Sequence, residues 1–226
     1  MRATFRSLIS PLIAFALLLG VSAARAETQQ QVLIDKSRFS IEKLLNNPDF
    51  TRMRAALKNA QGVLIIPSLL RGGIIIGGEG GTGVLMSRDA NGEWSYPAFF
   101  SVGGGSIGLQ IGFQDSEAVL VINTLKGLNA ILNNNMKLGF DASVAFGEVG
   151  QGIAGSTTTA LTADIEAYTK NRGLFAGGAF TGSVVSERAD LNRDFYGAGA
   201  TARAIVMDRA FRNPEADALR TAVVVQ

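Results

Sequence analysis

The chain has 226 residues, of which 47% are hydrophobic, and its 21 Lys and Arg nearly balance its 19 Asp and Glu. It contains no Cys and no His. These absences exclude disulfide bonds, thiolate nucleophiles, Cys/His zinc sites and histidine general bases. The length suits a single domain with ample sequence for a hydrophobic core. We therefore expect one globular domain that is held together by its core, with no metal and no cofactor.

Residues 1–26 have the pattern of a secretory signal peptide. Arg2 and Arg6 give a basic start, an apolar run covers residues 8–21, and Ala24-Arg25-Ala26 has the form of a cleavage site. We expect cleavage after Ala26 and export to the periplasm or to the periphery of an envelope membrane. A retained membrane anchor is the alternative, although the run is short for a span of about 20 residues.

Cleavage would also change the charge of the protein. The segment holds three arginines and no acidic residue, so its removal changes the net charge from +2 to −1. Global charge then gives no reason to expect nucleic acid as a partner.

Two helices are predicted at the start of the mature chain. The large apolar side chains of residues 27–46 fall on one face of a helix, as expected of a stripe that faces a core. Asn47-Pro48 is a typical start of a second helix, whose apolar positions recur with helical spacing up to Ala60.

The polar faces of these two helices carry the candidate binding residues. Five basic side chains and one aromatic ring could contact anionic lipid headgroups: Lys36, Phe39, Lys43, Arg52, Arg54 and Lys58. In that interpretation Phe39 inserts at the membrane interface. The alternative is an ordinary solvated face, partly neutralised by Asp35, Glu42 and Asp49.

The rest of the chain is predicted to be mostly strand. Short apolar runs at residues 63–66, 74–76, 84–86 and 98–102 are separated by glycines and by a turn at residues 89–92. A turn at residues 114–117, a helix over residues 125–132 capped by Thr124, and strands at residues 118–122, 137–146 and 157–169 follow. The end is predicted to be helical from residue 201, with Asn213-Pro214 opening the last helix.

Glycine within strands marks bulges and sharp bends. The sequence therefore predicts an α+β fold with a curled, Gly-rich antiparallel β-sheet or small barrel-like sandwich, flanked by N-terminal and C-terminal helices.

Two catalytic patterns overlap in the glycine-rich stretch, and neither is predicted to be functional. Gly103, Gly105 and Gly108 fit GxGxxG, but that pattern binds a dinucleotide only when a helix follows, and residues 109–113 alternate like a strand. Ser106 fits GxSxG, but its chemistry needs a base and the chain has no His. Lys126 or Lys137 could serve as a base only in principle, because their spacing gives no support. We expect no catalytic residue and no enzyme.

Several motifs together resemble the SYLF family. Residues 58–67 (KNAQGVLIIP) resemble its AKGxxIxP opening, and residues 77–85 resemble its GGxxGxGVL strand. Residues 94–112 (WSYPAFFSVGGGSIGLQIG) are similar to its WSxPAFxxxGGGSxGxQxG core. Shorter matches follow in order to Tyr196, so the resemblance covers roughly residues 41–223, nearly the whole mature chain.

The resemblance implies a single lipid-binding domain over residues 27–226 that performs no catalysis. Its expected partner is a membrane surface rich in anionic phospholipid, of the phosphoinositide type in the family. In eukaryotic members an N-terminal amphipathic helix is associated with lipid contact, and residues 27–46 lie at that position. Asn59 and Gln61 replace the usual Ala and Lys of the opening motif, so a basic position is lost here.

Actin is associated with yeast members of the family, but a secreted bacterial-type protein would not meet it, so actin is not an expected partner. Two other functions stay open at this point. One is a structural or protein-interaction module of the cell envelope, and the other is a small integral outer-membrane protein built of strands.

Overall fold

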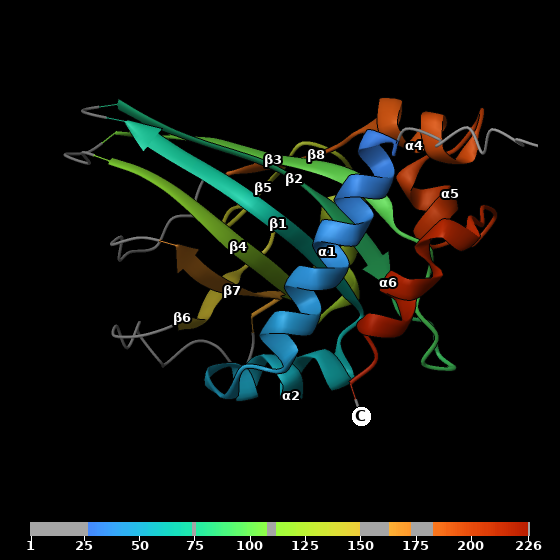
Figure 1. Cartoon of the computed structure of the whole chain (residues 1–226), viewed down its shortest axis with the longest axis horizontal. Helices are drawn as coiled ribbons and strands as arrows, with labels where there is room; N and C mark the ends of the chain where they lie inside the picture. The colour runs from blue at the N-terminus through green and yellow to red at the C-terminus, as the bar shows by residue number, and fades with distance from the viewer. Residues whose placement is uncertain (1–26, 74–75, 108–111, 150–162, 173–182, 226) are drawn as a thin grey trace, which may run out of the picture.

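The computed structural model describes residues 27–73, 76–107, 112–149, 163–172 and 183–225. These residues form an α+β fold in which one curled sheet of eight strands carries helices on both faces (Figure 1). The strand order is β5-β8-β3-β2-β1-β4-β7-β6. Neighbouring strands are antiparallel except for β6 and β7, which are parallel. The predicted fold class is confirmed, with this parallel pair as the departure from a purely antiparallel sheet.

The long strands of the sheet are adjacent in its centre, and the short ones lie toward its edges. The strands are β1 (Gly62–Gly73), β2 (Ile76–Ser87), β3 (Ala98–Ile107), β4 (Gly112–Ile122), β5 (Met136–Lys137), β6 (Val144–Val149), β7 (Ile165–Arg172) and β8 (Val184–Glu187). The helices are α1 (Gln29–Leu45), α2 (Thr51–Asn59), α3 (Leu125–Leu132), α4 (Ala189–Tyr196), α5 (Ala202–Val206) and α6 (Asp217–Ala222). No helix in the described ranges is long and apolar enough to cross a membrane.

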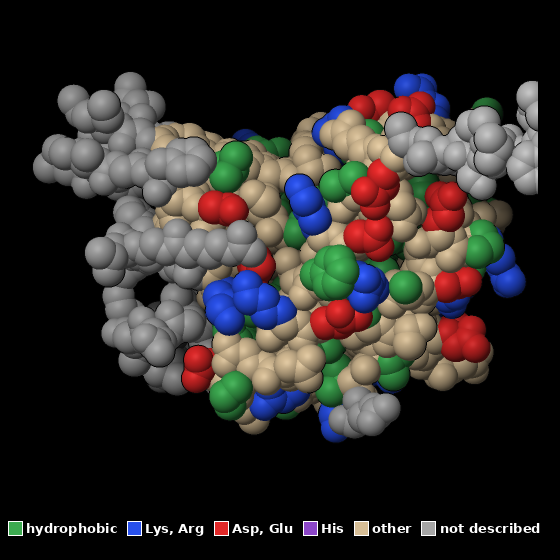
Figure 2. Space-filling view, viewed as in Figure 1, with side chains coloured by type: hydrophobic (Ala, Val, Ile, Leu, Met, Phe, Trp, Pro, Cys, Tyr) green, Lys and Arg blue, Asp and Glu red, His purple; other side chains and the backbone are tan. Residues whose placement is uncertain are grey.

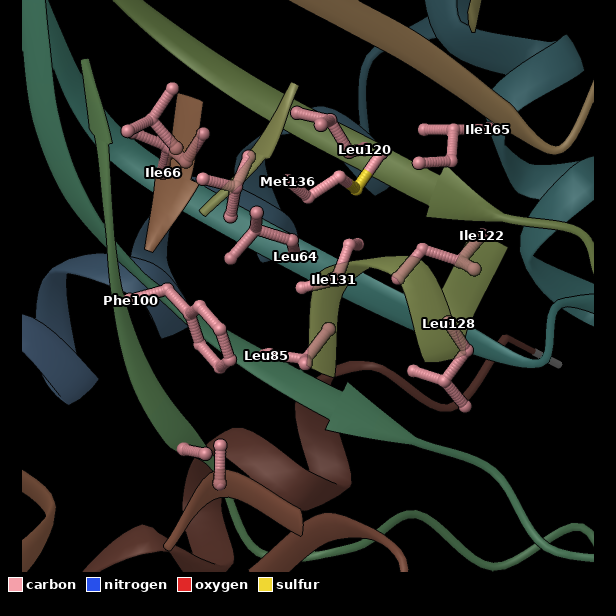
Figure 3. Packing of buried hydrophobic residues seen from close by; sticks show 14 of the residues in the cluster. Leu64, Ile66, Leu85, Phe100, Leu120, Ile122, Leu128, Ile131, Met136 and Ile165 are labelled. Atoms are coloured by element: carbon pink, nitrogen blue, oxygen red, sulfur yellow. The ribbon is translucent and has the colours of Figure 1, made fainter. Parts of the chain in front are cut away.

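The sheet separates two hydrophobic cores, which explains why its strands are apolar on both faces. On one face, Leu64, Leu120 and Phe100 pack against Leu128 and Ile131 of α3 (Figure 3). On the other face, the alternate strand residues pack against α1, the 3₁₀ turn that ends at Phe50, α2 and α6, through Ile34, Ile41, Leu44, Phe50, Met53, Leu57 and Leu219. The predicted apolar face of residues 27–46 is therefore the face that α1 buries.

The helix starts follow from local capping, as the sequence predicts. Asn47 accepts a hydrogen bond from the backbone N–H of Asp49, Thr124 from that of Gly127, and Asn213 from that of Glu215. These side chains satisfy N–H groups that have no partner within their own helix. Asn47 and Asn213 each precede a Pro that opens a short 3₁₀ turn before the α-helix.

The central strand β1 contains an irregularity. The register of β1 with β2 shifts between Ile65 and Ser68, a stretch that contains Pro67. Gly81 and Gly83 of β2 lie against this bulge. A Cβ at Gly81 would lie 2.6 Å from the carbonyl oxygen of Ser68, and a Cβ at Gly83 would overlap the carbonyl oxygen of Ile65. Only glycine allows the two strands to approach this closely, so these two glycines are required by the packing of β2 against the bulge.

Four elements of the structure differ from the prediction. The predicted turn at residues 114–117 lies inside β4, where Asp115 bonds to Ser68 of β1 and Glu117 to Lys43 of α1. The predicted strand over residues 137–146 is divided by a turn at Gly139, whose φ is +84°. Helix α4 was not predicted. Predicted strand residues 74–75 and 157–162 lie outside the described ranges, whereas β7 begins only at Ile165.

Candidate lipid-contact surface

Helix α1 lies across β1 and β2, on the face of the sheet that α2 and α6 also cover (Figure 1). Small side chains on its inner face, Ser37 and Ser40, are buried between the larger apolar anchors and let the helix approach the strands. On the opposite side, Lys36, Phe39 and Lys43 follow one another at helical spacing and are exposed. The structure therefore brings three of the six candidate residues into one solvent-facing stripe.

Phe39 is the large apolar side chain of this stripe. It is 57% exposed. The Arg38 guanidinium lies 4.1 Å from the centre of its ring, and the same guanidinium pairs with Glu42 at 3.1 Å. This cation–π contact and ion pair hold the ring at the surface.

Lys43 and Lys36 differ in their surroundings. The Lys43 ammonium pairs at 3.0 Å with Glu117, a carboxylate of β4 that is only 3% exposed. Lys43 thus anchors α1 to the sheet while its side chain remains partly accessible. Lys36 is exposed and forms no ion pair with the residues that the structure describes.

Arg52 is partly exposed, and its guanidinium joins a buried polar network. Its guanidinium lies 3.3 Å from Glu166 of β7. Glu166 also accepts hydrogen bonds from Tyr168 at 2.6 Å and from Asn123 at 3.0 Å. Burial, together with the Glu166 carboxylate, raises the pKa of the Tyr168 hydroxyl far above its ordinary value. The network ties α2 to the sheet.

Arg54 closes the corner between α1 and α2. It donates to the backbone carbonyls of Leu45 at 2.9 Å and Asn47 at 2.8 Å, and to the hydroxyl of Thr51 at 2.8 Å. Lys58 is exposed at the end of α2. The six candidate residues therefore do not form one surface: Arg52 and Arg54 have their donors engaged inside the protein, and Lys58 lies on a different helix from the stripe.

The exposed face over α1 carries mixed charge. Figure 2 shows this face, on which blue and red side chains lie among isolated green ones instead of forming one basic patch. The half-buried Asp35 and Glu42 flank the stripe on α1 itself. Any attraction of this face to an anionic surface is therefore local and modest.

The glycine-rich motif serves the sheet. Residues 103–107 lie in β3 and pair with β2, so these glycines do not open a helix, while residues 108–111 lie outside the described ranges. Across this part of the sheet, Glu79 pairs with Arg71 at 2.6 Å and accepts a hydrogen bond from Ser183. A Cβ at Gly104 would lie 3.0 Å from the Ser183 hydroxyl oxygen. Because Gly104 has no side chain, there is space for the hydrogen bond between Ser183 and Glu79.

A second polar cluster was missed in the sequence because its members are far apart along the chain. Asp164 accepts hydrogen bonds from Thr124 at 2.8 Å, from Ser143 at 2.9 Å and from Lys126 at 3.0 Å. Burial raises the pKa of the Asp164 carboxyl, but these hydrogen bonds outweigh burial and hold the pKa well below its usual range. Lys126 therefore acts as a structural partner here. Within the described ranges, no three acidic side chains are close enough together to hold a metal ion.

These observations define an α+β domain that displays one amphipathic helix on a curled sheet. The chain belongs to the Ysc84 family, described as "Las17-binding protein actin regulator", whose model matches residues 103–225. The resemblance to the SYLF family is thereby confirmed.

Known relatives cover most of the chain. It is 31% identical over 200 residues to SH3 domain-containing YSC84-like protein 1 of Xenopus laevis, with 88% of this chain and 59% of the relative covered. It is 34% identical over 166 residues to LAS seventeen-binding protein 3 of Saccharomyces cerevisiae, with 72% of this chain and 36% of the relative covered. The human SH3 domain-containing YSC84-like protein 1 is 32% identical over 152 residues, with 67% of this chain and 44% of the relative covered. The chain thus spans less than two thirds of the length of each of these relatives.

Proposed function

We propose that the protein binds anionic phospholipid at a membrane surface, without catalysis, through the outer stripe of α1. The observation that carries the proposal is the exposed Phe39 between Lys36 and Lys43. An apolar ring flanked by lysines is the arrangement with which interfacial helices enter the headgroup region. Lys58 at the end of α2 adds a further exposed cation.

The expected affinity is modest. A basic residue near an anionic membrane contributes about 1 kcal/mol, and burial of a Phe side chain about 1.5–3 kcal/mol. Phe39 is already partly covered by the protein, and Asp35 and Glu42 oppose the attraction. Binding of this kind is reversible and weakens as salt screens the charges. We further propose that the membrane belongs to the cell envelope, because residues 1–26 have the pattern of an export signal.

Sedimentation with vesicles tests the proposal. The protein starting at Glu27 retains every described helix and strand. We expect it to sediment with vesicles that contain phosphatidylglycerol and to stay in solution with phosphatidylcholine alone. Phe39→Ser should weaken binding about tenfold and Lys36→Gln about fivefold. Lys137→Gln is the matched control, because Lys137 is exposed on β5 and α1 packs over β1 and β2. Equal or negligible binding to both vesicle types would overturn the proposal.

A second candidate is a structural or protein-interaction module of the envelope. The family description and the names of the relatives refer to protein partners, which favours this candidate. It predicts a stable protein complex that can be isolated without lipid and that survives Phe39→Ser. Loss of the complex together with vesicle binding would instead assign both to α1.

A further inference from the structure

A cavity of about 230 Å³ lies where α2 ends, between α2, the turn at residues 89–92 and the residues that follow α6. Figure 1 shows the C-terminal end of the chain beside α2. Leu57, Trp94 and Val223 line the cavity and are almost fully buried, so they give it an apolar floor. Lys58 and Val224 line it as well and are exposed, so they form its rim.

The rim carries two cations, Lys58 and Arg88, that pair with no carboxylate of the described residues. Eight basic residues of the described ranges pair with an acidic group at 2.6–3.6 Å, namely Arg38, Lys43, Arg52, Arg71, Lys126, Arg188, Arg209 and Arg220. Arg88 and Lys58 form no such pair within the part of the chain that the structure describes. Asp89, the nearest carboxylate in sequence, is engaged by Arg209 and by the backbone of its own turn.

Arg88 is held in place at this rim. Its Nε donates to the Gly92 carbonyl at 3.1 Å, and its Nη1 donates to the Lys58 carbonyl at the end of α2. These bonds fix the guanidinium and leave further N–H groups of its fork free for an anion. The guanidinium also lies 6.0 Å from the centre of the Trp94 ring. The fold thus positions a planar cation, a flexible cation and an aromatic ring around one cavity.

We propose that this cavity binds a single phosphate monoester, with the phosphate on Lys58 and Arg88 and the attached carbon skeleton against Trp94. A phosphate monoester carries a charge near −2 at neutral pH, which matches two unpaired cations better than a diester or a carboxylate does. The volume is below the usual range for a whole drug-sized ligand and fits one headgroup-sized fragment. The apolar floor favours a group that continues into carbon over bare phosphate.

This site adds a specific ligand to the proposed function. It rests on that function only for the source of the ligand, because a membrane could present the phosphate as a lipid headgroup. Trp94 is the single tryptophan of the chain, so its fluorescence reports directly on this cavity. The probes are dihexanoyl phosphatidic acid, glycerol 3-phosphate and dihexanoyl phosphatidylcholine, all kept below the concentrations at which they aggregate.

We expect a saturable change of Trp94 fluorescence with dihexanoyl phosphatidic acid, weakening below pH about 6 as the phosphate loses its second charge. Tighter binding of this probe than of glycerol 3-phosphate would assign a lipid source, and equal binding would assign a free phosphate ester. Both results support the site. An equal response to phosphatidylcholine, or no response to either phosphate monoester, would overturn it.

Two substitutions at exposed rim positions test the role of charge without disturbing the core. Lys58→Gln should weaken binding of the phosphate monoester about tenfold, and Val224→Glu should weaken it by a similar or larger factor through repulsion. Lys36→Gln on α1 is the control and should leave the response unchanged. Undiminished binding in both rim variants would contradict the proposal. If the protein fails to bind vesicles but the Trp94 response is intact, only the proposed membrane function is wrong. If the protein binds vesicles but Trp94 does not respond, only this site is wrong.

Discussion

Gly80 and Gly83 lie on the same strand in opposite surroundings. A Cβ at Gly83 would overlap the Ile65 carbonyl oxygen of the bulged strand β1, whereas a Cβ at Gly80 would meet no atom within 4 Å. Glycine is therefore required at one position and merely tolerated at the other. The same distinction separates Gly104, which makes room for the contact between Glu79 and Ser183, from glycines that face open space.

This contrast gives a prediction at the residue scale. Gly83→Ala should lower the free energy of unfolding by at least about 2 kcal/mol, because a backbone atom must move to admit the methyl group. Gly80→Ala should leave stability unchanged or raise it by about 0.5 kcal/mol, because alanine suits a strand better than glycine. Urea unfolding of the two variants measures the difference. Similar values for both would mean that the bulge adapts to a side chain.

At the scale of elements, the corner between α1 and α2 depends on one guanidinium. Arg54 donates to the carbonyl of Leu45, the last residue of α1, and to that of Asn47, which also accepts from the Phe50 N–H at 3.1 Å. Arg52 acts similarly between α2 and β7 through Glu166. The basic residues that looked most like a lipid surface in the sequence therefore contribute in part to the packing of the two helices.

Arg54→Ala should accordingly cost about 2 kcal/mol of unfolding free energy, because it removes the donor to the Leu45 carbonyl and the bonds to Asn47 and Thr51 that join the two helices. Lys58→Gln, four residues further along the same helix and exposed, should change stability by no more than about 0.5 kcal/mol. Thermal or urea unfolding of both variants provides the comparison. A neutral effect of Arg54→Ala would show that water replaces the guanidinium at the corner.

At the scale of the whole molecule, stability in acid depends on carboxylates that accept several hydrogen bonds. The pKa of Asp164 is lowered in the folded protein relative to its ordinary value of about 4. A lowered folded-state pKa adds stability above about pH 4, and this stability is lost as the pH falls through the folded-state pKa. Asp164 joins the start of α3, the residues before β6 and the start of β7, so its protonation loosens three elements together.

Asp164→Asn should therefore cost about 1–3 kcal/mol near neutral pH, and the difference from the parent should shrink as the pH falls below about 4. Unfolding in urea across this pH range measures both quantities. A difference that stays constant with pH would mean that the carboxylate charge makes no contribution.

The sequence predicts what is decided locally. Asn47, Thr124 and Asn213 cap their helices because a side chain and a backbone N–H a few residues away suffice for the contact. The curled sheet could be predicted from glycines in apolar runs. The turn predicted at residues 114–117 was wrong because Ser68 and Lys43, remote in sequence, stabilise the polar residues of β4 as strand.

For the candidate lipid-contact surface too, the sequence predicts only what is decided within one helix. The helical period of residues 27–46 places Lys36 and Phe39 on a different face from the apolar stripe, and the structure shows that both side chains are exposed. The inward engagement of Arg52 depends on Glu166 in β7, which no spacing within α2 can reveal. The cavity at Trp94 combines residues from α2, from the turn after β2 and from the end of the chain, so only the folded structure could assemble it.

The packing of α1 along the sheet has a consequence for how the protein would meet a bilayer. Ile34, Ile41 and Leu44 are buried, and Lys43 is bound to the sheet, so the helix is complete before any contact occurs. Binding then requires no coil-to-helix transition, and far-ultraviolet circular dichroism should be the same with and without vesicles. The domain would land as a rigid body whose tilt is set by the axis of one helix, with only the Phe39 ring entering the headgroup layer.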